Sequence, residues 1–231
     1  MASAGPSSTR RSRRRERVAG LRASHTYGYV LLLIVISFAF TATAPDSNWA
    51  RSVIVFLQSA TLVVALWTSG LTRYARLSLS LVALAMVLAA VLVLHPSDTL
   101  TGIVGIFELL LTLAVAATVA FGIIDQGEVN AKSVTGAICV YLILGLMFTF
   151  FYGAVAALDS APLFTQGTDG TVSIRLYFSY ITLATVGYGD YTPATNLGHL
   201  LAIIEALTGQ LYLVTVVALL VSRIRPGRTR E

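Results

Sequence analysis

Six long apolar stretches constrain this chain more than any other feature. A helix needs about 20 mostly apolar residues to cross a bilayer. The stretches that meet this length are roughly 27–44, 52–71, 77–95, 100–124, 134–158 and 197–222. The chain is 56% hydrophobic and 12% charged, more apolar than a soluble domain of this size requires. We therefore predict an all-α membrane protein with six transmembrane helices.

Basic residues gather at the two ends of the chain. Seven arginines precede residue 23 and four follow residue 222. With the N-terminus placed inside, only Arg51 and Arg175 of the 16 Lys and Arg are external, which is a positive-inside pattern. We expect a multi-pass plasma-membrane protein with both termini cytoplasmic: a disordered basic segment 1–24 and a short basic tail 223–231. Anionic lipid is the partner these ends favour, rather than nucleic acid.

The segment between the fifth and sixth stretches contains the candidate site. Ser173–Ala184 is apolar but too short to span, so it reads as a re-entrant helix. The run Thr185-Val186-Gly187-Tyr188-Gly189-Asp190 follows at once, and its glycines allow backbone angles that a Cβ penalises. Non-helical backbone at membrane depth is tolerated where it is buried or lines a water-filled path. Rings of carbonyls from such a run can replace the water shell of a potassium ion.

Residues 177–193 resemble the pore helix and selectivity filter of tetrameric potassium channels, within a similar region from 134 to 222. The first four spans resemble the six-transmembrane, voltage-gated-like superfamily only in number and order. The resemblance implies that the carbonyls of Thr185, Val186, Gly187 and Tyr188 coordinate potassium, together with the Thr185 hydroxyl, in a filter that includes Gly189. It also implies three identical subunits as partners, potassium as the only metal, and no cofactor.

Side chains around the filter are expected to support it. The Tyr177 hydroxyl can bond Asp190, whereas Phe178 has no such group. Some relatives place a glutamate at the position of Ile181, and isoleucine cannot replace its bond to Asp190. We therefore expect fewer side-chain braces than in those relatives, with Tyr188 completing an aromatic cuff. The expected filter supports are Asp190, Tyr177, Phe178 and Thr182.

The outer loop carries Asp159, Asp169 and Asp190 against Arg175. Repeated around an axis, this excess of negative charge would concentrate cations at the outer mouth. For Asp159 and Asp169, a merely solvated acidic loop is the alternative.

The sixth stretch contains Gly209, which is either a hinge or a small residue that permits close packing. Glu205 is expected to bond backbone or hydroxyl groups behind the filter, because charges within spans are costly and normally face protein or water. A stripe at spacings of three and four is our candidate for the pore-lining face. Its residues are Gln210, Leu213, Val217 and Val221.

The region 25–126 is expected to form a four-helix module, followed by a pore domain over 127–222. A voltage sensor needs several regularly spaced positive charges on one span, and the stretch 100–124 has no Lys or Arg. Steep voltage gating is therefore not expected. The one charge there, Glu108, is a functional candidate or forms an interhelical hydrogen bond.

Two other functions remain open. One is a potassium transporter subunit of the type with four filter-like loops in one chain, and the other is a non-conducting membrane sensor or interaction protein. The chain has no nucleotide-binding glycine loop, no metal-ligand spacing and no nucleophile motif, so we do not expect an enzyme. His25, His95 and His199 stand singly near span ends, and Cys139 reads as a packing residue.

Overall fold

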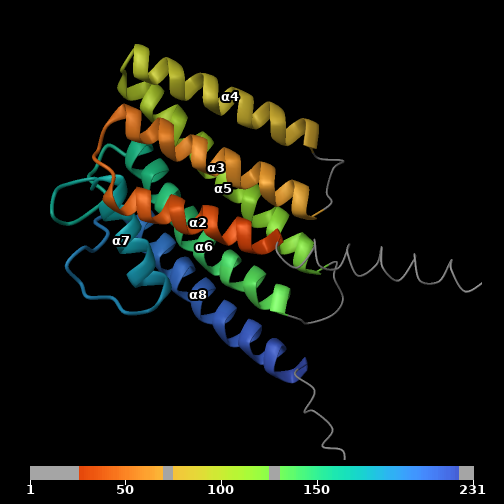
Figure 1. The fold of residues 1–231 in the computed structure, drawn as a ribbon. Coiled ribbons are helices and arrows are strands. Elements are labelled where there is room, and N and C mark those ends of the chain that lie inside the picture. Colours follow the sequence, from red (N-terminus) through yellow and green to blue (C-terminus); the bar gives the residue numbers. More distant parts are fainter. Residues whose placement is uncertain (1–25, 70–74, 125–130, 224–231) are drawn as a thin grey trace, which may run out of the picture.

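The computed structural model describes residues 26–69, 75–124 and 131–223. Within these ranges the protein is all helical, as predicted, with seven helices joined by short segments (Figure 1). The helices are α2 (Thr26–Thr43), α3 (Asn48–Ser69), α4 (Ala75–Leu94), α5 (Asp98–Ile124), α6 (Ala131–Leu158), α7 (Val172–Leu183) and α8 (Asn196–Arg223). The expected disordered segment 1–24 and most of the basic tail lie outside the described residues.

The largest difference from the predicted boundaries is at α3, which begins at Asn48 rather than near residue 52. Arg51 explains the earlier start: its N–H donates to the Ser47 carbonyl, with N and O 3.1 Å apart. Its guanidinium lies 3.6 Å from the Asp46 carboxylate. The first helical turn therefore comes from residues 48–51, just before the apolar stretch.

Five described helices are long and apolar enough to cross a membrane: α3, α4, α5, α6 and α8. The apolar part of α2, Gly28–Thr43, is shorter. Helix α7 has 12 residues, and at about 1.5 Å per residue it is far shorter than a bilayer core of about 30 Å. The structure thus supports an all-α membrane protein, and the sixth span remains a prediction.

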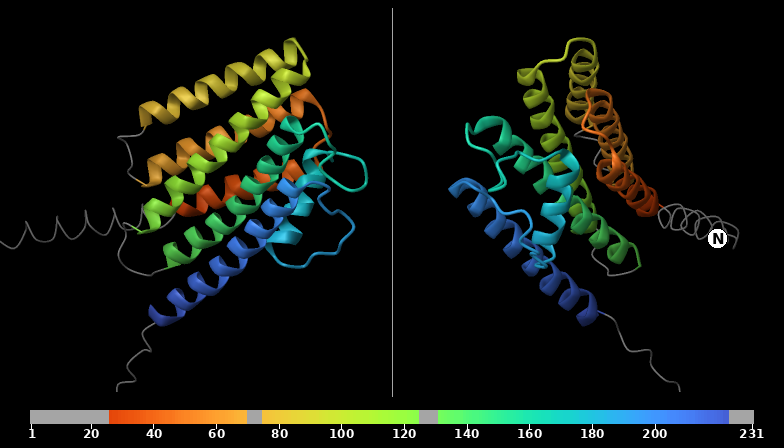
Figure 2. Two further views of the ribbon diagram at one scale, coloured as in Figure 1. Left: turned by 180° about the vertical axis from the view of Figure 1, so that it is seen from behind. Right: turned by 90° about the vertical axis from the view of Figure 1, so that its left-hand side faces the viewer.

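The helices form a bundle in which α6 holds the central place. Helices α2 and α5 pack on α6, α3 packs on α2 and α5, and α4 is outermost against α3 and α5. Helices α7 and α8 also pack on α6, and α7 lies near one end of the bundle (Figure 2). One apolar core joins the leading helices to α6, and a second, mostly aromatic core surrounds Tyr152, Phe164 and Phe178.

The leading helices also contact α7 of their own chain. The Ser173 hydroxyl donates to the Ala42 carbonyl at 2.8 Å. The rings of Phe38 and Tyr180 meet edge to face, with centroids 5.0 Å apart. The four-helix module is therefore attached to the helix that precedes the candidate filter.

We expect Gly145→Ala to destabilise the protein at the contact between α6 and α7. A Cβ at Gly145 would lie 2.5 Å from the Tyr180 ring, and the Tyr180 hydroxyl is bonded to the Leu142 carbonyl, so the ring cannot swing freely. Such overpacking lowers the free energy of unfolding by about 1–3 kcal/mol.

The matched control is Gly105→Ala in α5, where an added Cβ meets nothing within 4 Å. That change should raise stability by about 0.5–1 kcal/mol, because alanine has less backbone freedom to lose. Thermal unfolding in one detergent compares the two variants. Equal effects would contradict the close contact between Gly145 and Tyr180.

Candidate functional site

Defined hydrogen bonds close both ends of helix α7. At its start, the Thr171 side chain accepts a hydrogen bond from the Ile174 N–H, which is an N-cap. At its end, the Ala184 N–H is directed to the Thr182 and Tyr180 carbonyls. The chain then leaves the helix as the loop Thr185–Asp190.

The N–H groups of this loop turn back to the end of α7. Thr185 N–H donates to the Thr182 carbonyl at 2.9 Å, and the Val186 and Gly187 N–H groups donate to Ile181 at 2.8 and 3.2 Å. In the part of the chain that the structure describes, no hydrogen bond ends on the carbonyls of residues 185–188. These oxygens are therefore free to accept a cation. Ile181 contributes its carbonyl, a role that its apolar side chain does not reveal.

The backbone of the loop alternates in conformation. Positive φ angles occur at Thr185 (57°), Gly187 (54°) and Gly189 (79°). The two glycines fit the expectation from the sequence, but Thr185 is a β-branched residue in a region that such residues rarely adopt. Conformations of this kind cost about 1–3 kcal/mol and persist where surrounding structure imposes them. The alternation of positive φ angles thus begins at Thr185, two residues before the first glycine of the loop.

In a single chain the loop is not enclosed. The Val186 side chain is 50% exposed and the Tyr188 side chain is 72% exposed. The expected contact of Tyr188 with an aromatic cuff therefore remains a prediction about a larger assembly.

A short pairing between the outer loop and the segment after the filter was not predicted. Thr165 N–H donates to the Thr192 carbonyl at 2.9 Å, and Ala194 N–H donates to Leu163 at 2.8 Å. The Gln166 amide donates to the Asp190 carbonyl. These contacts join residues more than 20 positions apart, such as Gln166 and Asp190, which differ by 24. The local sequence carried no signal for them.

Aromatic residues surround α7 differently from the expected cuff. Phe178 is buried, and its ring packs edge to face on Tyr152 and Phe164, with centroids 5.0 and 5.2 Å away. Phe164 also contacts Tyr191 at 5.2 Å, and Tyr177 lies 6.5 Å from Tyr191. Phe178 thus joins α7 to α6 and the outer loop, and any support it gives the filter is indirect.

Tyr177 and Asp190 do interact. The side chain of Asp190 is the main cause that raises the pKa of the Tyr177 phenol, and the expected hydrogen bond between the two stays a prediction. Thr182 contributes its carbonyl to the Thr185 N–H.

Glu205 joins three helices behind the filter. Its side chain is fully buried. The Tyr152 hydroxyl of α6 donates to Oε2 at 2.7 Å, and the Ser179 hydroxyl of α7 lies 2.5 Å from Oε1. The expected bonds to hydroxyl groups are therefore present, although the sequence did not identify Tyr152 or Ser179.

Gly209 lies where α8 passes the end of α7. A Cβ at this position would be 2.2 Å from the Leu183 carbonyl oxygen. Helix α8 runs without a break through Gly209. Close packing is enough to require glycine here, and the hinge role stays a prediction. Gln210 and Leu213 are exposed in the single chain, and the side chains of Val217 and Val221 lie outside the described part.

Arg175 is buried rather than solvated, and its predicted place on the external side of the membrane stays a prediction. Its Nη1 donates to the Asp169 and Gly170 carbonyls at 3.1 and 2.6 Å. The Asp169 carboxylate accepts from the Leu163 N–H at 2.9 Å. Burial, and then the charge of Arg51, lower the pKa of Arg175 to about 10, so it stays charged at neutral pH. Asp169 and Arg175 thus shape the loop.

Glu108 is buried within the four-helix module, and its Oε1 has no hydrogen-bond partner among the described residues. The expected interhelical hydrogen bond is not formed by this oxygen. Arg51 and Arg175 are the cations whose charges act on Glu108.

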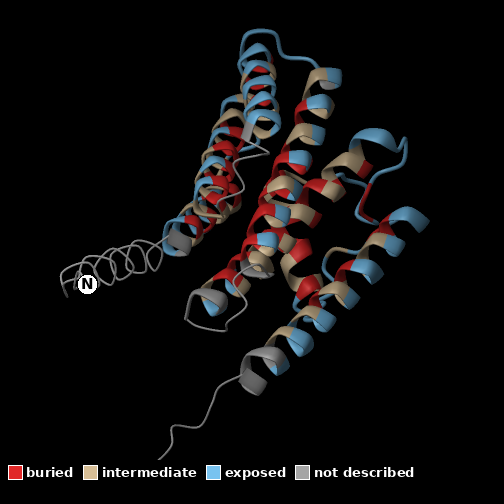
Figure 3. Cartoon of the chain, turned by 90° about the vertical axis from the view of Figure 1, so that its right-hand side faces the viewer, coloured by how far each residue is buried: buried red, intermediate tan, exposed pale blue. Residues whose placement is uncertain are grey.

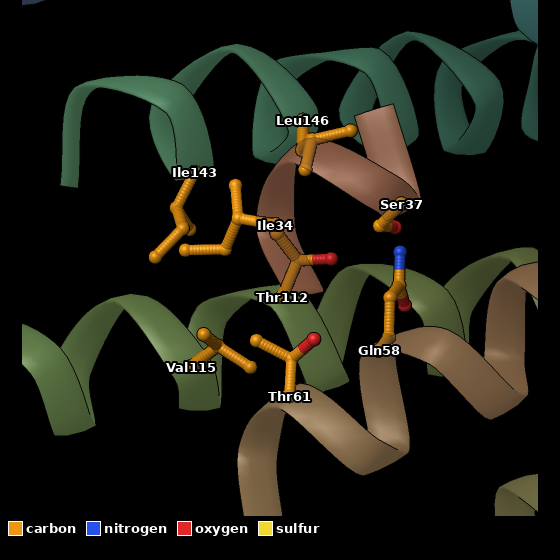
Figure 4. A pocket seen from close by; sticks show the side chains of 8 residues that line it. All are labelled: Ile34, Ser37, Gln58, Thr61, Thr112, Val115, Ile143 and Leu146. Carbon is orange, nitrogen blue, oxygen red and sulfur yellow. The ribbon is translucent and has the colours of Figure 1, made fainter. Parts of the chain in front are cut away.

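A small cavity lies between α2, α3, α5 and α6 (Figure 4). Its volume is about 20 Å³, far below the roughly 300 Å³ or more of a typical small-molecule pocket. This cavity is therefore too small for a metabolite. The lining residues are Ile34, Ser37, Gln58, Thr61, Thr112, Val115, Ile143 and Leu146.

We expect Gly209→Ala to lower the free energy of unfolding by about 1–3 kcal/mol, because the added Cβ overlaps a backbone carbonyl that cannot move aside. Gly102→Ala is the control, since its Cβ would make only an ordinary contact of 3.6 Å with Ala157. Thermal unfolding of the two variants distinguishes the roles, because a packing role of Gly209 predicts a loss of stability and a role as a hinge alone does not. Wild-type stability of Gly209→Ala would contradict the packing role.

Comparisons with known proteins agree with this geometry. Residues 136–225, which include nearly all of α6 and the whole of α7, match a family model described as ion channel. The potassium voltage-gated channel subfamily KQT member 1 of Xenopus laevis is 24% identical over 211 residues, or 77% of this chain and 31% of that protein. The probable potassium channel protein 2 of Methanocaldococcus jannaschii is 31% identical over 45% of this chain and 26% of its own length.

The inward rectifier potassium channel Kirbac3.1 of Paramagnetospirillum magnetotacticum is 30% identical over 44% of this chain and 35% of that protein. The aligned parts thus span 26% to 35% of these relatives. The apolar helices support a membrane protein, residues 136–225 are similar to an ion-channel family, and parts of the chain are similar to potassium channels.

Proposed function

We propose that this protein is the subunit of a homotetrameric potassium-selective channel in the plasma membrane. Six spans, with α7 as a re-entrant pore helix, would leave both termini in the cytoplasm. The observation that carries the proposal is the loop Thr185–Gly189: α7 binds its first three N–H groups, while the carbonyls of residues 185–188 remain available. Four such loops around one axis would replace the water shell of a dehydrated potassium ion.

The exposed side of α8 supports a multi-subunit assembly. Exposed residues follow one another along α8 (Figure 3), and several of them are large and apolar. In the proposed tetramer, neighbouring subunits cover part of this surface, and the stripe at Gln210 and Leu213, continued by Val217 and Val221, faces the pore. The exposed apolar residues are Leu200, Ile203, Leu207, Leu211 and Val214.

Flux into liposomes containing the purified protein tests the proposal. We expect potassium flux far above sodium flux, and a loss of about tenfold or more in Gly187→Ala. Alanine is strained at positive φ by about 1–2 kcal/mol, the strain recurs in every subunit, and about 1.4 kcal/mol is already a factor of ten.

Gly167→Ala is the matched control. Gly167 also has a positive φ, 76°, and open space around its Cβ position, but it lies in the outer loop. Its flux should stay near that of the wild type. Equal sodium and potassium fluxes, or no flux through the wild type and Gly167→Ala, would favour the transporter or the non-conducting sensor.

We also expect weak voltage dependence. Helix α5 occupies the position of a sensor helix but has no Lys or Arg, and its buried Glu108 is a single charge. Each charge that crosses the membrane contributes only about 2.3 kcal/mol per 100 mV. Gating-current recordings should therefore show less than about one elementary charge per subunit. Several charges per subunit would overturn this part of the proposal.

A further inference from the structure

The hydroxyl of Ser179 makes two short contacts with oxygen atoms. It lies 2.5 Å from Glu205 Oε1 and 2.7 Å from the Gly145 carbonyl oxygen. Each contact needs one proton between its two oxygens, and a serine hydroxyl has only one to give. The Gly145 carbonyl carries no proton. The second proton must therefore be on Glu205.

An ionised Glu205 would leave this arrangement unsatisfied. Ser179 would donate to the carboxylate, and its oxygen would then face the Gly145 carbonyl oxygen with no proton between them. The Thr149 hydroxyl already donates to that carbonyl at 2.8 Å. It therefore cannot also supply a proton to the Ser179 contact.

The surroundings of Glu205 also disfavour a negative charge. The carboxyl group is fully buried, and the groups that bond it are the hydroxyls of Ser179 and Tyr152. The titratable groups around it are phenols: Tyr141 and Tyr152 on α6, and Tyr180 on α7. No cation among the described residues acts on it. A buried charge without a cation is costly, and such groups usually stay neutral instead.

We propose that Glu205 is a neutral carboxylic acid that donates its proton to Ser179 and so positions α7 between α6 and α8. The chain of donors then runs from Tyr152 to Glu205 Oε2, and from Glu205 Oε1 through Ser179 to the Gly145 carbonyl. Every polar atom in the chain is satisfied. Glu205 is thus a positioning residue for the helix that holds the filter loop, and its neutral state is independent of whether the protein conducts ions.

Infrared spectroscopy of the full-length protein in lipid bilayers tests the proton directly. Glu108→Gln serves as the background, because it removes the other buried glutamate. At neutral pH we expect the Glu108→Gln variant to show the carbonyl band of a protonated carboxylic acid. The double variant Glu108→Gln/Glu205→Gln should lack this band. The proposal would be overturned if the double variant kept the carbonyl region of the Glu108→Gln spectrum unchanged and lost intensity in the carboxylate bands instead.

Three further variants keep the test decisive if the double variant is poorly folded. Ser179→Ala in the Glu108→Gln background removes the acceptor of the acid proton, so the carbonyl band should move to higher frequency. Glu205→Gln alone should retain thermal stability near that of the wild type, because an amide can donate to Ser179 and accept from Tyr152. Glu205→Leu can do neither and should unfold at a lower temperature. Equal unfolding temperatures for these two variants, or an unmoved band in Ser179→Ala, would contradict the donor chain.

The infrared result is distinct from the flux result. A protein that shows the acid band but passes no potassium would retain this inference and lose the proposed function. A protein that passes potassium but lacks the acid band would retain the proposed function and lose this inference.

Discussion

The filter loop depends on the last carbonyls of α7. A helix leaves its final carbonyls without partners in the helix, and a non-helical loop at membrane depth leaves N–H groups that water cannot reach. Here each set of groups satisfies the other, because the N–H groups of Thr185, Val186 and Gly187 donate to the carbonyls of Ile181 and Thr182. The loop therefore takes its position from the end of α7, and the carbonyls of residues 185–188 accept no hydrogen bond from the described residues.

Helix α7 must then be fixed more firmly than a 12-residue helix can be by itself. It is held by the hydroxyls of Ser179 and Tyr180, which bond α6 and Glu205 of α8. Single hydrogen bonds add only about 0.5–1.5 kcal/mol each. The close approaches at Gly145 and Gly209 matter as much, since they leave no room for α7 to shift toward either neighbour.

Sequence patterns predicted the parts of this arrangement that are local. Apolar length identifies the helices, and the two glycines identify the strained loop. Contacts between distant residues were missed for a physical reason: Tyr152 and Glu205 are 53 positions apart, and helical spacing says nothing about which neighbour a side chain meets. Charge counting also says nothing about packing: Arg175 is buried beside Gly153 of α6 and bonds the Asp169 and Gly170 carbonyls. Thr185 shows the same limit, since a β-branched residue gives no sign that its φ is positive.

The four-helix module lies in direct contact with the helix that holds the filter. Ser173 bonds the end of α2, and Phe38 of α2 packs on the ring of Tyr180. Tyr180 in turn lies against Gly145 of α6 and accepts the Ala184 N–H with its carbonyl where the loop begins. A displacement of α2 therefore acts on α7 at both its first turn and its last turn. Since α5 has no ladder of positive charges, packing contacts such as this one are how the leading helices can influence the loop, directly or through α6.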